Sequence, residues 1–258
     1  MLRAITRAVS PSINRCELSF HARQPIDVEI ARAQHRAYED TLRRIGVDVV
    51  ALPEEPDLPD AVFVEDPAIV LDEVAVINRM GAESRRAEAA SLGVALARYR
   101  PIEFLTEPAT LDGGDVMRIG PTLFVGASHR TNPEGIRQLS AILRPHGYDV
   151  KPIAVNGCLH LKSACSYIGN DTVLINKFWI DASPFEGLQL IEVPVEEPGA
   201  ANALLIERTV ILPASFPLTR EKLDQHGFRV QTVDVSELQK AESGVSCMSV
   251  IFRDLTAA

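Results

Sequence analysis

The chain has 258 residues, of which 46% are hydrophobic and 24% are charged. This balance is typical of a folded globular protein and excludes a disordered, collagenous or coiled-coil chain. The net charge of −9 argues against a nucleic-acid partner and leaves room for a cationic ligand.

We expect a soluble cytoplasmic protein. No window carries the roughly 20 uninterrupted apolar residues of a membrane-spanning helix, and the N-terminus lacks the apolar stretch of a secretory signal. Four cysteines are too few for a disulfide framework at this size, and no Cys-x-x-Cys pair suggests a structural zinc site. We therefore predict free thiols, each either a buried filler or a nucleophile: Cys16, Cys158, Cys165 and Cys247.

Amphipathic patterns predict several outer helices. The first spans 27–45, where apolar residues recur at helical spacing among Arg and Glu, and a strand follows at 47–53. Further helical segments are expected at 84–100, 131–147 and 219–227. Asn132 and Thr219 are expected as N-terminal caps, and glycines stand where helices should stop, at Gly46, Gly147 and Gly227.

A hairpin of two apolar strands recurs along the chain. It is predicted at 62–78, 113–126, 159–176 and 201–215, and it begins again at 246–252. Equivalent points are about 40 to 50 residues apart, a period typical of arrays and propellers: Asp66, Asp115, Lys162, Asn202 and Cys247. The repeat predicts one α/β domain over 1–258, either a ring of five units around a central channel or a mixed α/β sandwich.

Polar residues stand at the predicted starts of successive inner strands, where apolar residues are expected. Ionised carboxylates are almost never buried without a partner. Several of them converging on one channel beside a thiol and an imidazole would form a pocket for a cation. The members of this set are Glu65, Asp66, Asp112, Asp115, His160, Lys162, Asn202, Ser246 and Cys247.

Six motifs, in order, resemble the dimethylarginine dimethylaminohydrolases of the guanidino-group-modifying (pentein) superfamily. They are FVEDPAIV (63–70), GAESRRAE (81–88), LDGGDVM (111–117), FVGASHRTN (124–132), LHLKS (159–163) and SELQKAESGVSCMS (236–249). The resemblance implies a five-bladed α/β propeller and hydrolysis of Nω-methylated arginine to citrulline and an amine. It implies neither a metal nor an organic cofactor.

The resemblance also implies roles for individual residues. Cys247 matches the nucleophile that forms a covalent S-alkylthiouronium, His160 matches the general acid and base, and Asp112 matches the carboxylate that orients the histidine. Glu65 and Asp66 resemble the clamp on the guanidinium.

Other residues match the part of the family site that binds the amino-acid end of the substrate. Arg85 and Arg130 match the residues that bind the α-carboxylate. Asp60 matches the partner of the α-amino group, together with the backbone carbonyls of Leu18 and Ala241. Residues 10–25 are expected to form a lid.

Alternatives remain within and outside this activity. The same chemistry would serve an arginine deiminase or an amidinotransferase, although the short chain lacks the helical insertion typical of deiminases. A noncatalytic binding protein of the same fold is disfavoured because Cys247, His160 and Asp112 occur together. Cys158 could be a second thiol near His160, a metal ligand together with His160, or a buried filler. The protein could be a monomer or a homodimer.

Overall fold

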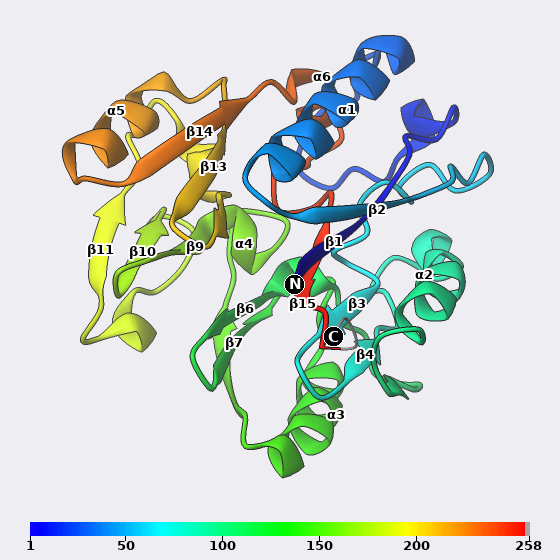
Figure 1. The fold of residues 1–258 in the computed structure, drawn as a ribbon. Coiled ribbons are helices and arrows are strands. Elements are labelled where there is room, and N and C mark those ends of the chain that lie inside the picture. Colours follow the sequence, from blue (N-terminus) through cyan, green and yellow to red (C-terminus); the bar gives the residue numbers. More distant parts are fainter. Residues whose placement is uncertain (256–258) are drawn as a thin grey trace.

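The computed structural model describes residues 1–255, which contain five three-stranded sheets arranged about a common centre (Figure 1). In every sheet the first strand pairs antiparallel with the second, and the second pairs parallel with the third. Four sheets are consecutive in sequence: β3 (Ala68–Val70), β4 (Ala75–Ile77) and β5 (Ile102–Phe104); β6 (Val116–Ile119), β7 (Thr122–Ala127) and β8 (Asp149–Ala154); β9 (Cys165–Gly169), β10 (Thr172–Ile175) and β11 (Gln189–Glu192); β12 (Leu204–Ile206), β13 (Thr209–Pro213) and β14 (Arg229–Val233).

The fifth sheet is built from both ends of the described chain. β15 (Val250–Arg253) supplies its first strand, and β1 (Leu2–Arg7) and β2 (Asp48–Leu52) supply the other two. The first strands lie next to one another, with β15 beside β3, β6 beside β9 and β9 beside β12. The fivefold repeat is confirmed, and the alternative of a mixed α/β sandwich is wrong.

In four of the five sheets an α-helix connects the second strand to the third on the outside of the ring (Figure 1). These are α1 (Val28–Arg44), α2 (Glu88–Leu96), α3 (Pro133–Leu143) and α5 (Pro217–Gln225). The connection from β10 to β11 contains only a 3₁₀ turn. Two helices of four residues, α4 (Leu161–Ala164) and α6 (Ser236–Gln239), lie near the centre, and 3₁₀ turns occur at Ile13–Arg15, Glu83–Arg85, Gly113–Asp115, Arg144–His146, Ser183–Phe185 and Pro198–Ala201.

The helix boundaries follow from local chemistry, with one exception to the expected caps. The side chain of Asn132 accepts a hydrogen bond from the N–H of Gly135 and caps α3, as predicted. Thr219 is not a cap, because α5 begins two residues earlier and the Thr219 hydroxyl instead donates to Glu197. Glycines with positive φ follow three helical segments, as expected: Gly46 (+93°), Gly147 (+84°) and Gly227 (+80°).

The polar residues expected at strand starts lie just before the strands instead. Asp66 precedes β3 by two residues, Lys162 belongs to α4 ahead of β9, and Cys247 precedes β15 by three. In these positions the chain has left the hydrogen-bonded ladder and can turn its side chains toward the centre. No helix within residues 1–255 is long and apolar enough to span a membrane.

Candidate active site

A cavity of about 170 Å³ opens among the loops that precede the inner strands. Five of the predicted site residues line it: Glu65, His160, Lys162, Asn202 and Cys247. Phe20 and His21 from the N-terminal segment and the rings of Trp179 and Phe216 line it as well. The other predicted residues stand behind or beside this cavity.

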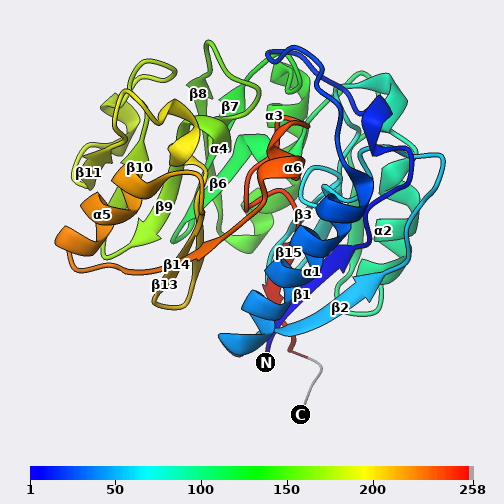
Figure 2. The ribbon, with the colours of Figure 1, turned by 90° about the horizontal axis from the view of Figure 1, so that it is seen from above.

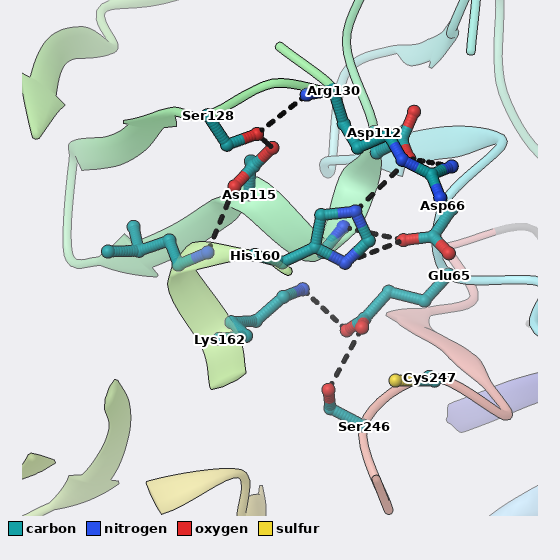
Figure 3. Close-up of polar contacts among 12 residues, drawn as sticks. Glu65, Asp66, Asp112, Asp115, Ser128, Arg130, His160, Lys162, Ser246 and Cys247 are labelled. Carbon is teal, nitrogen blue, oxygen red and sulfur yellow. Dashed lines mark hydrogen bonds and ion pairs between the residues drawn. The ribbon is translucent and has the colours of Figure 1, made fainter. Parts of the chain in front are cut away.

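His160 is held between two carboxylates (Figure 3). Its Nε2 lies 3.1 Å from Oδ2 of the fully buried Asp112, and its Nδ1 lies 3.9 Å from Oδ1 of Asp66. Burial opposes charge on the ring, but the negative charges of Asp66, Asp115 and Asp112 outweigh burial and raise the pKa of His160 to about 9. The ring is therefore an imidazolium at neutral pH and can donate a proton.

Cys247 is half-buried at the cavity, where its Sγ accepts a hydrogen bond of 3.4 Å from the N–H of Gly244. Burial, followed by the charges of Glu65 and Asp66, raises the pKa of the Cys247 thiol to about 12. In the unliganded protein the sulfur is a thiol. A cation placed against the two carboxylates would oppose the electrostatic part of this shift and favour the thiolate.

The carboxylate of Glu65 is fixed by Lys162 from α4 and by Ser246 from the loop before β15 (Figure 3). Lys162 Nζ donates to its Oε1 at 2.5 Å, and Ser246 Oγ donates to its Oε2 at 2.9 Å. Asn202 in turn donates to Ser246 Oγ and to the carbonyl of Lys162. Glu65, Lys162, Asn202 and Ser246 thus form one connected network beside the cavity.

Asp66 and Arg85 form a buried ion pair. Arg85 Nη1 lies 2.8 Å from Asp66 Oδ2, while its Nε and Nη2 donate to both oxygens of Glu88 at 3.1 and 2.9 Å. Burial opposes ionisation of Asp66, but His160 and Arg85 outweigh it and lower its pKa. Arg85 is only 4% exposed. Its hydrogen bonds to the carboxylates of Asp66 and Glu88 occupy much of the guanidinium.

The residues predicted to bind the amino-acid end gather near the N-terminal segment. Asp60, which is 5% exposed, accepts hydrogen bonds from the N–H of Glu17. Arg130 is also 5% exposed; its Nη2 donates to Ser19 Oγ at 3.2 Å. Within residues 1–255, Arg130 Nη1 has no hydrogen-bond acceptor and lies 3.7 Å from Asp112 Oδ2. An unpartnered buried donor of this kind suits an anionic ligand group.

The segment over residues 17–21 is tied to the loop that precedes Cys247. The carboxylate of Glu242, a residue with φ of +57°, accepts hydrogen bonds of 2.5 to 3.0 Å from the N–H groups of Ser19, Phe20 and His21. The ring of Phe20 also packs against that of His129 in a tilted arrangement, with ring centroids 5.6 Å apart. Figure 2 shows this blue segment at the end of the ring opposite the two termini.

Leu18 and Ala241 contribute to the same neighbourhood through the backbone. The side chain of Leu18 is partly buried against the core cluster that contains Ala241. Neither side chain lines the cavity. Their predicted role rests on carbonyl oxygens, which a sequence constrains only weakly.

Both glycines of LDGGD permit close approach at the site. A Cβ on Gly113 would lie 2.0 Å from the carbonyl oxygen of Glu65, and one on Gly114 would lie 2.4 Å from His160 Nδ1 and 2.9 Å from Asp66 Oδ1. The N–H of Gly114 donates to Asp66 Oδ1 at 2.9 Å. Glycine is therefore required for His160 and Asp66 to take their places.

One cluster could hold a cation. Asp66, Asp112 and His160 present ligand atoms within 4.8 Å of one another, but these atoms also pair with each other, with Arg85 or with Arg130. Cys158 lies at the cavity and donates to the carbonyl of His160 at 3.4 Å. Burial raises the pKa of this thiol to about 12, so it is a weak nucleophile at neutral pH.

The sequence did not identify several residues that support the site. Glu88 behind Arg85, Glu242 at the N-terminal segment, and the hydroxyls of Ser128 and Thr131 behind Asp115 contact predicted residues. Glu88 lies three residues after Arg85, a helical spacing that pairs opposite charges and could have revealed it. The other contacts depend on loops that meet only in the fold.

Comparison with known proteins shows the family to which the chain is related. The family model described as N,N dimethylarginine dimethylhydrolase, eukaryotic, matches residues 5–182. The N(G),N(G)-dimethylarginine dimethylaminohydrolase of Pseudomonas aeruginosa is 40% identical over 91% of this chain and 92% of its own length. The protein of that name from Streptomyces coelicolor is 39% identical over 98% of each chain.

Solved structures agree in fold. A cysteine-to-serine mutant of the Pseudomonas aeruginosa enzyme in complex with citrulline superposes with a TM-score of 0.92 at 38% identity, covering 97% of this chain and 98% of that one. The N-terminal domain of ArgZ, covalently bound to a reaction intermediate, has a TM-score of 0.88 over 98% of each chain, and at 17% identity it shows the five-bladed pentein fold alone. The chain belongs to the dimethylarginine dimethylaminohydrolase family.

Proposed function

We propose that this protein hydrolyses Nω-methylated arginine, both asymmetric dimethylarginine and monomethylarginine, to citrulline and dimethylamine or methylamine. The observation that carries the proposal is the meeting of Cys247, the His160–Asp112 pair and the carboxylate of Glu65 at one cavity. A nucleophile, a proton donor and a cation-binding group are the parts that cleavage of a guanidinium requires.

Substrate binding prepares the nucleophile. The guanidinium would lie against Glu65 and Asp66, whose negative charges raise the pKa of Cys247 when no cation is present. A positive charge at that place lowers this pKa, and the thiol loses its proton to solvent. The thiolate thus forms only when there is a carbon for it to attack.

Two steps then follow, each with one proton transfer at His160. The Cys247 sulfur bonds to the guanidino carbon, His160 protonates the methylated nitrogen, and the bond from carbon to that nitrogen breaks. This releases the amine and leaves an S-alkylthiouronium. Water then attacks the same carbon while His160 takes one of its protons, and the carbon–sulfur bond breaks as the second proton passes to solvent, which gives citrulline and the thiolate.

Asp112 keeps His160 ready for both transfers. Its Oδ2 lies 3.1 Å from Nε2 of His160, which fixes the ring and leaves Nδ1 for proton exchange with the substrate. A pKa of about 9 supplies the proton at neutral pH for the first step. General acid and base catalysis of this kind contributes about 10²–10⁴ to a rate.

We assign the amino-acid end of the substrate to the neighbourhood of the N-terminal segment. The unpartnered Nη1 of Arg130 supports binding of the α-carboxylate there. Arg85 has fewer free donors because Asp66 and Glu88 engage it, so its part in α-carboxylate binding rests on its remaining N–H groups. Asp60 and the carbonyls of Leu18 and Ala241 would receive the α-ammonium.

We further propose one catalytic domain over 1–258, with residues 10–25 as its lid; residues 256–258 lie outside the described range. The contacts of Glu242 with residues 19–21 support the lid. All four cysteines are free, which supports a reducing compartment such as the cytoplasm. The net charge of −9 favours a small cationic ligand over nucleic acid. We propose that the protein is a monomer or a homodimer.

The test is product release from purified protein given asymmetric dimethylarginine, monomethylarginine and arginine separately. Citrulline, methylated amines and ammonia are measured, with Cys247→Ser as the blank. We expect citrulline with dimethylamine or methylamine and little product from arginine. Ammonia from arginine would instead indicate a deiminase, and no product from any of the three would contradict the proposal.

A further inference from the structure

Asp115 is a buried carboxylate that the reaction does not use directly. It is 0% exposed and accepts hydrogen bonds from Ser128 Oγ at 2.6 Å, Thr131 Oγ1 at 2.6 Å and the N–H of Leu161 at 2.9 Å. No Lys or Arg within residues 1–255 forms an ion pair with it. Burying a carboxylate without a cationic partner costs free energy, so the hydrogen bonds that Asp115 accepts must offset this cost.

Each of its partners leads to a residue with a proposed role, and Figure 3 shows Ser128 between Asp115 and Arg130. Thr131 Oγ1 donates to Asp115 and accepts a hydrogen bond of 3.2 Å from the N–H of Asp112. Ser128 Oγ donates to Asp115 and accepts one of 3.0 Å from the N–H of Arg130. The N–H of Leu161, which follows His160 directly, donates to the other carboxylate oxygen.

All three partners donate hydrogen bonds to residue 115, so the side chain at this position must act only as an acceptor. Asp115 Oδ2 receives both hydroxyl protons, and Oδ1 receives the Leu161 amide proton. The two hydroxyls thereby keep their lone pairs for the N–H groups of Asp112 and Arg130. An asparagine would place an NH₂ against at least one donor, so one of the three connections would break.

We propose that Asp115 is a positioning residue, which holds the backbone at Asp112, at Arg130 and next to His160 in register through Thr131, Ser128 and Leu161. One carboxylate thereby couples the groups proposed for proton transfer to the group proposed for α-carboxylate binding. The roles given to these groups rest on the proposed function, whereas the hydrogen bonds that connect them do not.

The three connections predict different kinetic effects. Thr131→Val removes the link to Asp112 and should lower kcat by up to about a hundredfold, with KM little changed, because small misplacement of a catalytic group has effects of that size. Ser128→Ala removes the link to Arg130 and should raise KM for methylarginine more than it changes kcat. Asp115→Asn should do both. Thr172→Val, which removes a fully buried hydroxyl at β10, is the matched control and should change neither.

A titration tests the same arrangement without turnover. The charged and titratable groups around His160 are Asp66, Asp112 and Asp115, with His129 and Arg130 beyond them. The ring protons of His160, followed by NMR in the unliganded protein, should titrate at lower pH in Asp115→Asn than in the wild type. Thr172→Val should leave the midpoint unchanged.

The outcomes separate this inference from the proposed function. If the wild type releases no product but Asp115→Asn shifts the His160 midpoint and weakens citrulline binding, the function is wrong and the positioning role stands. If the wild type is active and the Ser128, Thr131 and Asp115 variants match Thr172→Val in kcat, KM and the His160 midpoint, the positioning role is overturned. Ser128→Ala and Thr131→Val decide the matter if Asp115→Asn fails to fold.

Discussion

The N–H of Glu65 donates a hydrogen bond of 3.1 Å to the carbonyl oxygen of Cys247. This bond joins the loop before β3 to the loop before β15, so the main chain fixes the candidate nucleophile beside the candidate clamp. Changes to either side chain should therefore alter charge and reactivity while leaving this backbone contact in place.

Glu65→Gln should lower the pKa of Cys247, because the negative charge of Glu65 is, after burial, the largest contribution that raises it. The rate of Cys247 alkylation by iodoacetamide, measured against pH, should rise at lower pH than in the wild type. Lys162→Met should move the curve the opposite way, since the Lys162 charge favours the thiolate. Shifts of both variants in one direction would contradict this electrostatic account.

Stability should depend on pH through His160. Its pKa is raised to about 9 in the folded state, above its ordinary value of 6.5, so the stabilisation is fully present below about pH 6.5 and is lost as the pH rises through about 9. The difference in the free energy of unfolding between wild type and His160→Gln, measured by urea titration, should shrink between pH 6 and pH 10. A difference that grows over this range would show that the ring is neutral in the folded protein.

Gly114→Ala should abolish activity while the protein remains folded. The added methyl group would meet the side chains of His160 and Asp66, which can move aside only by leaving their places in the site. Gly113→Ala meets the Glu65 carbonyl instead and should lower the melting temperature more strongly. Activity assays and thermal melts of the two variants check this contrast, and an active Gly114→Ala would show that the His160 position is not critical.

Glu242→Gln should loosen the N-terminal segment. A carboxylate accepts hydrogen bonds from all the N–H groups of residues 19–21 that face it, whereas an amide would place its own NH₂ donor against at least one of them. We expect faster limited proteolysis within 10–25 and a higher KM for methylarginine. Glu192→Gln, at an exposed pair with Lys177, is the control, and equal cleavage rates in both variants would refute the role of Glu242.

The sequence predicted the repeat but not how it closes. Alternating apolar residues predicted the hairpins because the contacts within a hairpin are local. The pairing of β1 with β15, from the far end of the chain, cannot be read from the repeat period. Thr219 was misplaced for the same reason, since its partner Glu197 lies outside the helix that the local pattern describes. The sheet of β9, β10 and β11 has no α-helix between its second and third strands, a departure that the repeat period does not predict.

For the candidate site, the residue types and their repeat spacing indicated which side chains meet. They could not show that Arg85 forms ion pairs with both Asp66 and Glu88, because these two carboxylates meet the guanidinium only in the folded protein. Nor could they show the hydroxyls of Ser128 and Thr131 turning toward Asp115. Such second contacts depend on the exact path of loops, which hydrophobic patterning does not constrain.

The pairing of β1 with β15 also sets the time at which activity can appear during synthesis. Cys247 lies in the loop just before β15, and that strand can dock on β1 only after it has left the ribosome. The other four sheets can form earlier, each from consecutive residues. A nascent chain can therefore hold His160 and the carboxylates in the loops of these four sheets before Cys247 reaches them.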